Sequence, residues 1–214
     1  MPMVDSPSAG ATSTPRPGLR ARKKAATMRH IQDEALRLFE VRGFDTVSIE
    51  QVAEAALVSP STIYRYFGTK EGLVLHDEYD DRIRDQLRHC LAQGGGLADT
   101  VTGVLGDVWN DHSVNSAATV MLRTRLCFEV PSIQGAMSLV INQEVDAMAR
   151  VAAATGRWTF RTARVLASAV IWAIMGVFRN WYDDGFTTDL REGIDEVLAW
   201  LPALESAVAA ARDE

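Results

Sequence analysis

The sequence predicts an all-α protein of about nine helices, in which a helix-turn-helix domain precedes a larger helical bundle. Three observations lead to this prediction. Apolar residues recur at steps of three and four along most of the chain. No segment alternates apolar and polar residues as strands do. Residues 48–67 contain two short helical patterns with a tight turn between them. We therefore expect a disordered tail (residues 1–18), the small domain (residues 19–69) and the bundle (residues 70–214).

The chain begins with a tail, a basic arm and a first helix. Residues 1–18 hold four of the seven prolines and lack apolar periodicity, which is typical of disorder. Residues 19–24 are the basic arm, and the first helix is expected over residues 25–42. Gly43 suits the position that ends a helix, because glycine adopts the left-handed conformation without steric cost. The apolar face of this helix consists of Met28, Ile31, Ala35, Leu38 and Phe39.

The helix-turn-helix pattern begins with a short helix after Thr46. Ser48 is a good N-cap residue, and Gln51 three positions later completes the spacing of a capping box. In such a box each residue satisfies a backbone N–H that the first helical turn leaves unpaired. The apolar positions that follow share one helical face: Ile49, Val52, Ala53 and Ala56.

The second helix of the pattern follows a two-residue turn. Ser59 is expected to cap it, and Pro60 occupies its first position, where a missing N–H has no cost. Ile63 and Phe67 are four residues apart and point inward. The remaining side chains offer hydroxyls, phenols and a guanidinium, which suit phosphate oxygens and base edges: Ser61, Thr62, Tyr64, Arg65 and Tyr66. We therefore interpret this segment as the recognition helix of a DNA-binding motif.

The charge distribution supports this interpretation. The net charge is −6, yet residues 1–70 carry ten Lys and Arg against seven Asp and Glu, while residues 71–214 carry twelve against twenty-one. The basic residues concentrate between Arg16 and His30, where no acidic residue occurs. DNA affinity depends on local neutralisation of phosphates, so the first 70 residues form the half that faces DNA. The remainder is expected to be repelled by DNA.

Residues 20–75 resemble the DNA-binding domain of the tetracycline-repressor (TetR) family. The resemblance rests on the first-helix pattern of residues 31–44, on the apolar face after Ser48, and on the order and spacing of residues 58–71. It implies a homodimeric transcriptional regulator, most often a repressor. Such a repressor leaves a palindromic operator when a small hydrophobic or amphipathic ligand binds to its second domain.

The resemblance also implies roles for individual residues. Tyr64, Tyr66 and Lys70 match positions that usually contact phosphates. Apart from the resemblance, we expect Ser61, Thr62 and Arg65 to read base edges. The basic arm has two interpretations, a solvated extension or a contact to phosphates or the minor groove. The full set of predicted DNA-binding residues is Arg20, Arg22, Lys23, Lys24, Ser48, Ser59, Ser61, Thr62, Tyr64, Arg65, Tyr66 and Lys70.

One position departs from the family pattern. The family usually has glycine in the turn, where this chain has Leu57. A left-handed conformation costs an L-residue roughly 1–2 kcal/mol that glycine avoids. Either the turn has a different shape or packing offsets the strain.

The bundle is expected to start with one long helix and to continue with five further helical segments. Thr69 should cap a helix over residues 70–92, which is the covalent link between the two domains. A Gly-rich break separates it from the rest. Further helices are expected over residues 97–110, 116–129, 132–155 and 159–184. The last helix should start after a cap at Thr187 or Thr188, and Pro202 should kink or break it before a final helical piece.

The dimer interface is expected on the last two long helices. In the family these helices pair with those of a second subunit in a four-helix bundle. Small residues recur on the first of them, and apolar residues recur on the second; the alternative is that both faces pack within one subunit. The predicted interface residues are Ala169, Ala173, Gly176, Asn180, Ile194, Val197, Leu198 and Leu201.

The effector pocket is expected among methionine and aromatic side chains, which adapt to irregular cavities. Arg123 and Arg125 lie on an otherwise apolar helix, two residues apart and thus on different faces. One of them should face inward, paired with a carboxylate or an anionic ligand group. The predicted pocket residues are Trp109, Met121, Arg125, Phe128, Met137, Trp172, Met175 and Phe178. Ordinary core packing is the alternative role of each apolar member.

The bundle also resembles, at a few positions, regulators akin to the mycofactocin regulator. These positions lie between Arg123 and Ile133, with Trp181 at the end of a later helix. Members of that group respond to acyl-CoA thioesters. The resemblance implies that an acyl-CoA or another amphipathic acyl compound should be tested first.

Other functional classes find little support in the sequence. It contains no glycine-rich phosphate loop, paired carboxylates or nucleophile with a neighbouring base, so we expect no enzyme and no cofactor. Cys90 and Cys127 lack metal-ligand spacing and are expected to be buried thiols, and no metal site is predicted. The N-terminus lacks a signal peptide's apolar core, and the apolar run of residues 165–178 is too short for a membrane span, so a cytoplasmic location is expected. The alternative function is a helical enzyme or ligand-binding protein with a vestigial DNA-binding motif.

Overall fold

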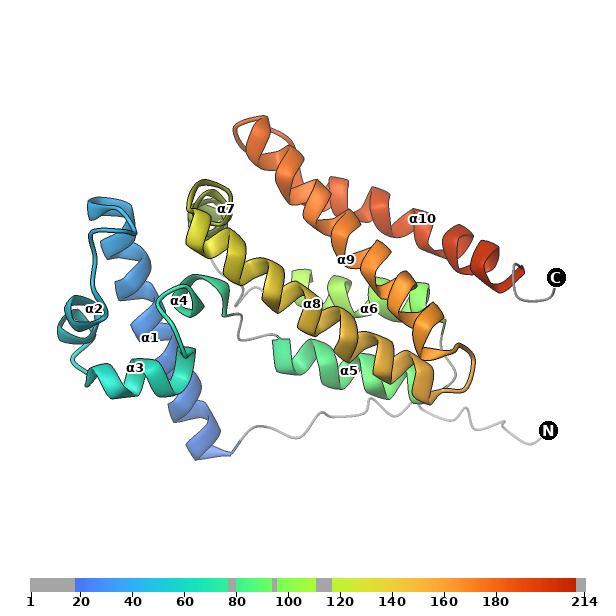
Figure 1. Ribbon diagram of the computed structural model, residues 1–214, viewed down its shortest axis with the longest axis horizontal. Coiled ribbons are helices and arrows are strands. Elements are labelled where there is room, and N and C mark those ends of the chain that lie inside the picture. Colours follow the sequence, from blue (N-terminus) through green and yellow to red (C-terminus); the bar gives the residue numbers. More distant parts are fainter. Residues whose placement is uncertain (1–17, 77–79, 94–95, 111–116, 211–214) are drawn as a thin grey trace, which may run out of the picture.

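The computed structural model describes residues 18–76, 80–93, 96–110 and 117–210, which form ten helices and no strand (Figure 1). The all-α fold class is therefore confirmed, with one helix more than expected. The first four helices gather at one end of the molecule, and the other six form the bundle beside them. The predicted tail lies almost wholly outside the described residues.

The basic arm is part of the first helix. Helix α1 (Leu19–Arg42) begins before the predicted start at residue 25. The residues of the arm are leucine, arginine, alanine and lysine, which are all strong helix formers, and this composition explains the extension. The arm is thus helical and not a flexible extension, while its basic side chains remain exposed to solvent. The helix ends at Gly43 as predicted, with a left-handed φ of 83° and an N–H that donates to the carbonyl of Phe39.

The small domain packs α2 (Ile49–Ala55), α3 (Pro60–Phe67) and the short α4 (Gly72–Leu75) against α1. Leu126 and Ile133 of the bundle belong to the same apolar core, so the two domains pack directly against each other. The residues of this core that are almost fully buried include Ile31, Ala35, Phe39, Val47, Val52, Ala53, Ile63, Leu73 and Val74.

The predicted long helix over residues 70–92 is interrupted. Helix α4 ends at Leu75, the next residue His76 has an extended backbone with ψ of 128°, and helix α5 comprises Asp80–Ala92. The apolar spacing of the sequence continues through this region, and for that reason the break was missed. Gly72 seats α4 against the end of α3 so closely that a Cβ atom there would lie 2.0 Å from the carbonyl oxygen of Phe67. This contact places the start of α4 directly against the end of α3.

The bundle agrees with the predicted helix boundaries to within a few residues. Its other members are α6 (Leu97–Asn110), α7 (Ala117–Glu129), α8 (Pro131–Ala154), α9 (Phe160–Asp183) and α10 (Leu190–Ala210). Helices α8 and α9 form a long pair, α10 packs on α9 and α6, and α5 packs on α6 and α8 (Figure 1). Helices α7 and α8 both contact α4, and α7 also contacts α1, so these two helices connect the bundle to the small domain.

Two details of α10 differ from the prediction. The residue before the helix, Asp189, accepts from the backbone N–H groups of Arg191 and Glu192 at 2.8 and 3.3 Å, whereas the hydroxyl of Thr188 donates to Asp184. The helix therefore starts later than expected. It also continues through Pro202, since packing of its apolar face against α6 and α9 offsets one lost backbone hydrogen bond.

Candidate nucleic-acid interface

The capping box at the start of α2 is confirmed. The N–H of Gln51 donates to Ser48 Oγ at 3.3 Å, and the N–H of Ser48 donates to Gln51 Oε1 at 2.9 Å. Both side chains are exposed, so the N-terminal end of α2 faces solvent. The partial positive charge of a helix N-terminus favours anions, which suits a position beside a DNA phosphate.

The turn between α2 and α3 keeps the left-handed conformation despite its leucine. Leu57 has a φ of 54° and its side chain is 90% exposed. Its N–H donates to the carbonyl of Glu54, and the N–H of Val58 donates to that of Ala53, the pattern of a Schellman motif. The turn therefore has the usual shape, and side-chain packing does not offset the strain at Leu57.

The recognition helix α3 divides its side chains as predicted between core and surface. Ile63 and Phe67 are buried. Ser59 has the backbone conformation of an N-cap, but its side chain makes no capping hydrogen bond, which corrects the sequence prediction. Its hydroxyl lies 2.9 Å from the hydroxyls of both Ser61 and Thr62. Three hydroxyl groups thus gather at the N-terminal end of α3, where each can donate or accept.

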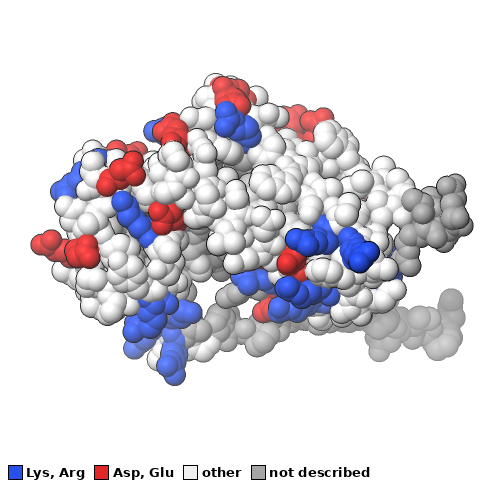
Figure 2. Space-filling model, viewed as in Figure 1, with Lys and Arg blue, Asp and Glu red and all other residues white. Residues whose placement is uncertain are grey.

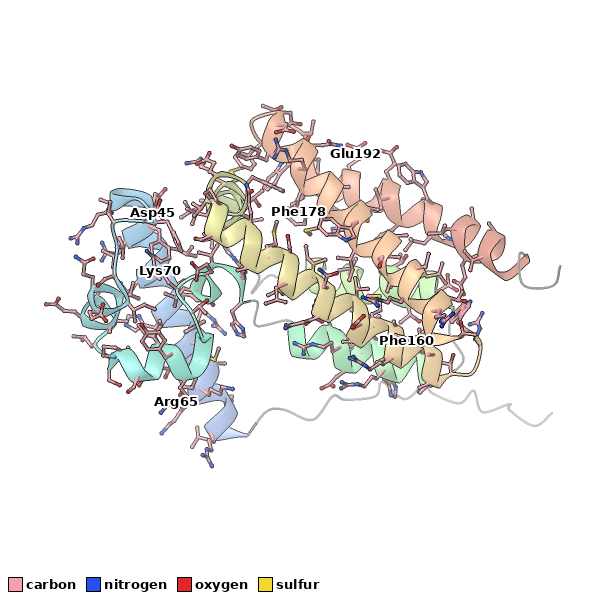
Figure 3. The ribbon with its side chains drawn as sticks, in the orientation of Figure 1. Asp45, Arg65, Lys70, Phe160, Phe178 and Glu192 are labelled. Atoms are coloured by element: carbon pink, nitrogen blue, oxygen red, sulfur yellow. The ribbon has the colours of Figure 1, made fainter. Side chains whose placement is uncertain are left out.

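Cationic side chains stack on aromatic rings along the same domain. The Nζ atom of Lys24 lies 5.9 Å from the centre of the Tyr66 ring, and the guanidinium carbon of Arg65 lies 4.8 Å from it. The Nζ atom of Lys70 lies 4.2 Å from the centre of the Phe44 ring. Figure 3 labels Arg65 and Lys70 at two places on this domain. These contacts hold three of the predicted DNA-binding cations in defined positions.

The basic side chains of α1 and α3 form one surface patch. Figure 2 shows a group of Lys and Arg side chains at the end of the small domain where the N-terminal half of α1 and the end of α3 meet in Figure 1. The exposed predicted members are Arg20, Arg22, Lys23, Lys24 and Arg65. No acidic residue occurs between Arg16 and Gln32, so the charged side chains at this end of α1 are all positive. A positive surface favours binding to DNA phosphates.

The predicted pocket residues do not form a single group. Met121 and Phe178 pack at the edge of the main bundle core, whereas Met137 and Met175 pack on a separate cluster around Ile141, Val145 and Ala167 between α8 and α9. The ring of Phe128 lies 5.4 Å from that of Tyr182, and Trp172 is half exposed. The side chain of Trp109 lies outside the described part of the structure.

The side chain of Arg125, which the sequence places in the pocket, is exposed. The arginine that faces inward is Arg123. Its Nε atom donates to the carbonyl of Val74 at 2.8 Å, and its Nη2 atom donates to that of His76 at 3.0 Å. It thus binds the C-terminal end of α4. Sequence reasoning offered no signal for this partner, because backbone carbonyls belong to every residue.

Gln32 completes the contact from the side of α1. Its Nε2 atom donates to the carbonyls of Leu73 at 3.2 Å and His76 at 2.8 Å. Since the last carbonyls of a helix lack partners within the helix, these donors satisfy groups that α4 would otherwise leave unpaired. The sequence analysis missed Gln32, which has no distinguishing pattern in the chain.

The predicted dimer residues fall into two sets. On α9, Ala169 and Ala173 are half-buried, and Gly176 and Asn180 are exposed. On α10 the predicted residues are buried in the core of the same chain, which corrects that part of the prediction: Ile194, Val197, Leu198 and Leu201. Helical periodicity shows that a face is apolar but not which neighbour covers it. The exposed aromatic residue of α10 is Trp200, at 58%.

The fold and this surface define a helix-turn-helix DNA-binding protein with a helical second domain. Residues 31–76 match the family model of bacterial regulatory proteins of the tetR family, and residues 96–205 match that of the MftR C-terminal domain. The chain therefore belongs to the TetR family of bacterial transcriptional regulators, and its second domain is of the MftR type. The predicted family and the mycofactocin-regulator resemblance are both confirmed.

Two relatives illustrate how far the similarity extends. The transcriptional regulator TcmR of Streptomyces glaucescens is 44% identical over 34% of this chain, and the matched part is about a third (31%) of TcmR. MftR of Mycobacterium tuberculosis is 25% identical over 86% of this chain and 95% of its own length. The similarity to TcmR thus concerns one domain, whereas that to MftR spans both.

Solved structures share the fold. A TetR-family regulator from Streptomyces coelicolor has a TM-score of 0.52 at 22% identity and covers 92% of this chain and 99% of its own. NalD, the secondary repressor of the MexAB-OprM multidrug efflux pump in Pseudomonas aeruginosa, has a TM-score of 0.52 at 17% identity and covers 84% and 95%. At this identity the similarity concerns the fold alone.

Proposed function

We propose that this TetR-family protein is a homodimeric repressor that binds a palindromic operator and is released by a small hydrophobic or amphipathic ligand. The observation that carries the proposal is the contact of Arg123 with the end of α4. It connects the second domain to a helix that Gly72 seats directly against the recognition helix. A change in the position of α7 would therefore be transmitted to α3.

On the DNA side, the hydroxyl groups at the start of α3 would read base edges. Ser61 and Thr62 lie at the N-terminal end of the recognition helix, which in helix-turn-helix proteins enters the major groove. Tyr64 is half exposed and, like the basic residues of α1, would contact the phosphate backbone. Ser48 at the start of α2 and Lys70 near α4 would complete the phosphate contacts.

The dimer would form through the exposed faces of α9 and α10, which run along one edge of the bundle (Figure 1). Val165 and Trp172 are 65% and 49% exposed, and Ala169 and Gly176 continue the same helical stripe at steps of three and four. Large exposed apolar residues in one stripe favour burial against another helix. Among the described residues, α9 is long and apolar enough to cross a membrane by length and composition. Pairing with a second copy explains that character in a DNA-binding protein.

The effector would bind in the bundle beside α7. Met121 on α7 and Phe178 on α9 pack at the edge of the bundle core, and a methionine-containing cluster between α8 and α9 lies near them. Such side chains rearrange at small cost around an apolar ligand. The MftR-type domain supports acyl-CoA thioesters and other amphipathic acyl compounds as the first ligands to test. A regulator of this kind would act in the cytoplasm.

The mechanism would have two states. In one, the dimer holds its two α3 helices about one DNA turn apart, roughly 34–36 Å. The ligand would bind more tightly to a second state in which α7, and with it α4, has shifted, so that the spacing no longer fits the operator. The ligand's preference for one state sets the size of the effect, typically about 1–3 kcal/mol.

A gel-shift experiment with the DNA upstream of the protein's own gene tests this function. We expect salt-sensitive binding that unrelated competitor DNA does not remove, and release when the correct ligand is added. A thermal-shift screen over acyl-CoAs, fatty acids and aromatic drugs would identify that ligand. Absence of sequence-specific binding at every protein concentration would contradict the proposal.

A further inference from the structure

We infer that the ring of Tyr66 holds Lys24 and Arg65 together as one phosphate-binding pair that joins α1 to the end of the recognition helix. The inference rests on the proposed DNA-binding function and changes the role of Arg65. The sequence suggests base reading for Arg65, whereas its surroundings in the structure favour a contact with the DNA backbone.

The geometry of the three side chains carries this inference. The Lys24 ammonium lies 5.9 Å and the Arg65 guanidinium carbon 4.8 Å from the centre of the Tyr66 ring. Both distances are within the roughly 6 Å at which a cation is attracted to an aromatic face. Tyr66 is half-buried and packs on the core of the small domain, whereas both cations are exposed. The ring is thus a fixed platform for two charges that come from different helices.

The charges of this group favour an anion. In the described part of the chain, neither Lys24 nor Arg65 makes an ion pair with a carboxylate. Two like charges on one ring repel each other, and an anion between them would remove the repulsion. Arg20 and Lys23 lie close by on the same helix and add positive charge, and Figure 2 shows this end of the domain rich in Lys and Arg. A guanidinium beside an ammonium suits the oxygens of a phosphodiester.

The position of the group separates it from the base-reading end of α3. The hydroxyls of Ser59, Ser61 and Thr62 gather at the N-terminal end of the helix, whereas Arg65 belongs to its last turn. Figure 3 shows Arg65 beside the N-terminal half of α1. The guanidinium of Arg65 thus stacks on Tyr66 at the end of α3 opposite to the hydroxyls. The expected ligand is therefore a backbone phosphate of double-stranded DNA.

The test compares variants by fluorescence anisotropy on operator and unrelated DNA over a range of salt concentrations. Tyr66→Phe keeps the ring and should keep the wild-type salt slope. Tyr66→Leu removes the ring but no charge; it should weaken binding to both DNAs about two- to fivefold and flatten the slope by about one. Phe160→Leu at the start of α9 is the control, because it removes a partly exposed ring of the second domain on which no cation stacks among the described residues. Melting temperatures report whether each variant folds.

A double-mutant cycle adds a readout that a purely structural role would not change. Lys24→Gln removes an exposed charge and should flatten the salt slope in the wild-type background but much less in the Tyr66→Leu background. Arg65→Gln should leave the ranking of operator variants unchanged. Three results would overturn the inference. They are a salt slope of Tyr66→Leu equal to that of the wild type, equal effects of Lys24→Gln in both backgrounds, and a changed ranking of operator variants in Arg65→Gln. If the wild-type protein itself shows no salt-sensitive specific binding, the proposed function fails as well.

Discussion

Gln32 and Arg123 donate to the same carbonyl oxygen, that of His76, from opposite sides of the boundary between the two domains. The distances are 2.8 Å from Gln32 and 3.0 Å from Arg123. The ring of His76 meets the ring of Phe67, the last residue of the recognition helix, at 5.6 Å and nearly at right angles. One residue thus contacts α1, α3 and α7. A shift of α7 would change the support of α4 and, through it, that of α3.

Loss of Arg123 should therefore destabilise the boundary between the domains. Arg123→Met leaves the carbonyls of Val74 and His76 with fewer donors in a partly buried place, so we expect the free energy of unfolding to fall by about 1–3 kcal/mol. Arg125→Met on the exposed face of the same helix is the control and should change it by less than about 0.5 kcal/mol. Urea denaturation measures both. Equal effects of the two variants would show that the contact has no special role.

The structure shows which parts of the chain local sequence patterns determine. The capping box of Ser48 and the inward positions of Ile63 and Phe67 were predictable, because each depends on residues a few positions apart. The end of α4 at Leu75 was not, because the apolar spacing of the sequence continues beyond it and the groups that bind its last carbonyls come from distant helices. The contact of Arg123 with α4 was missed for a related reason, since the groups that it binds there are the backbone carbonyls of Val74 and His76.

The same limit explains the errors in the second domain. The stripe that includes Ile194, Leu198 and Leu201 is apolar, as predicted, but the tertiary packing decides that α6 and α9 cover it within one chain. No pattern in the sequence predicted that Trp200 on the same helix would be exposed. Periodicity thus located the helices accurately and left the partner of each face undetermined.

Leu57→Gly should stabilise the protein. The left-handed backbone at Leu57 costs a side chain roughly 1–2 kcal/mol, and part of that gain is lost because glycine raises the entropy of the unfolded chain. We expect a net increase in the free energy of unfolding of about 0.5–1 kcal/mol. Leu57→Ala keeps the strain and should give no such increase, because the leucine side chain is exposed and contributes little packing. Thermal or urea unfolding of both variants checks this, and a larger increase for the alanine variant would refute the explanation.

Gly72→Ala should have a large effect for its size. The new Cβ atom would meet the carbonyl oxygen of Phe67 at 2.0 Å, so α4 must move away from α3. We expect a loss of about 1–3 kcal/mol in unfolding free energy together with weaker operator binding. Gly103→Ala in α6 is the control, because nothing lies within 4 Å of a Cβ atom there, and it should be neutral or slightly stabilising. Wild-type operator affinity in Gly72→Ala would show that α4 does not position α3.

Stability should depend on Cys127 at alkaline pH. Burial on α7 raises the pKa of this thiol from 9.0 to about 11, although the nearby Arg123 acts in the opposite direction. Between these two values the unfolded chain releases the proton and the folded chain keeps it, so stability is intact below pH 9 and falls as the pH rises towards 11. In Cys127→Ala the fall in the free energy of unfolding at alkaline pH should be smaller by up to roughly 2–3 kcal/mol than in the wild type. In Cys90→Ala the fall should equal that of the wild type. Urea denaturation at pH 8 and pH 10.5 distinguishes them; identical pH dependence in all three proteins would contradict the assignment.

The central claim is that two copies of the chain present their α3 helices at a fixed separation on DNA. The most direct test measures the affinity for a natural operator and for the same operator with five base pairs inserted between its half-sites. The insertion turns one half-site by about half a helical turn, so we expect two-chain binding to weaken by about tenfold or more. An unchanged affinity, with two chains still bound, would contradict the account.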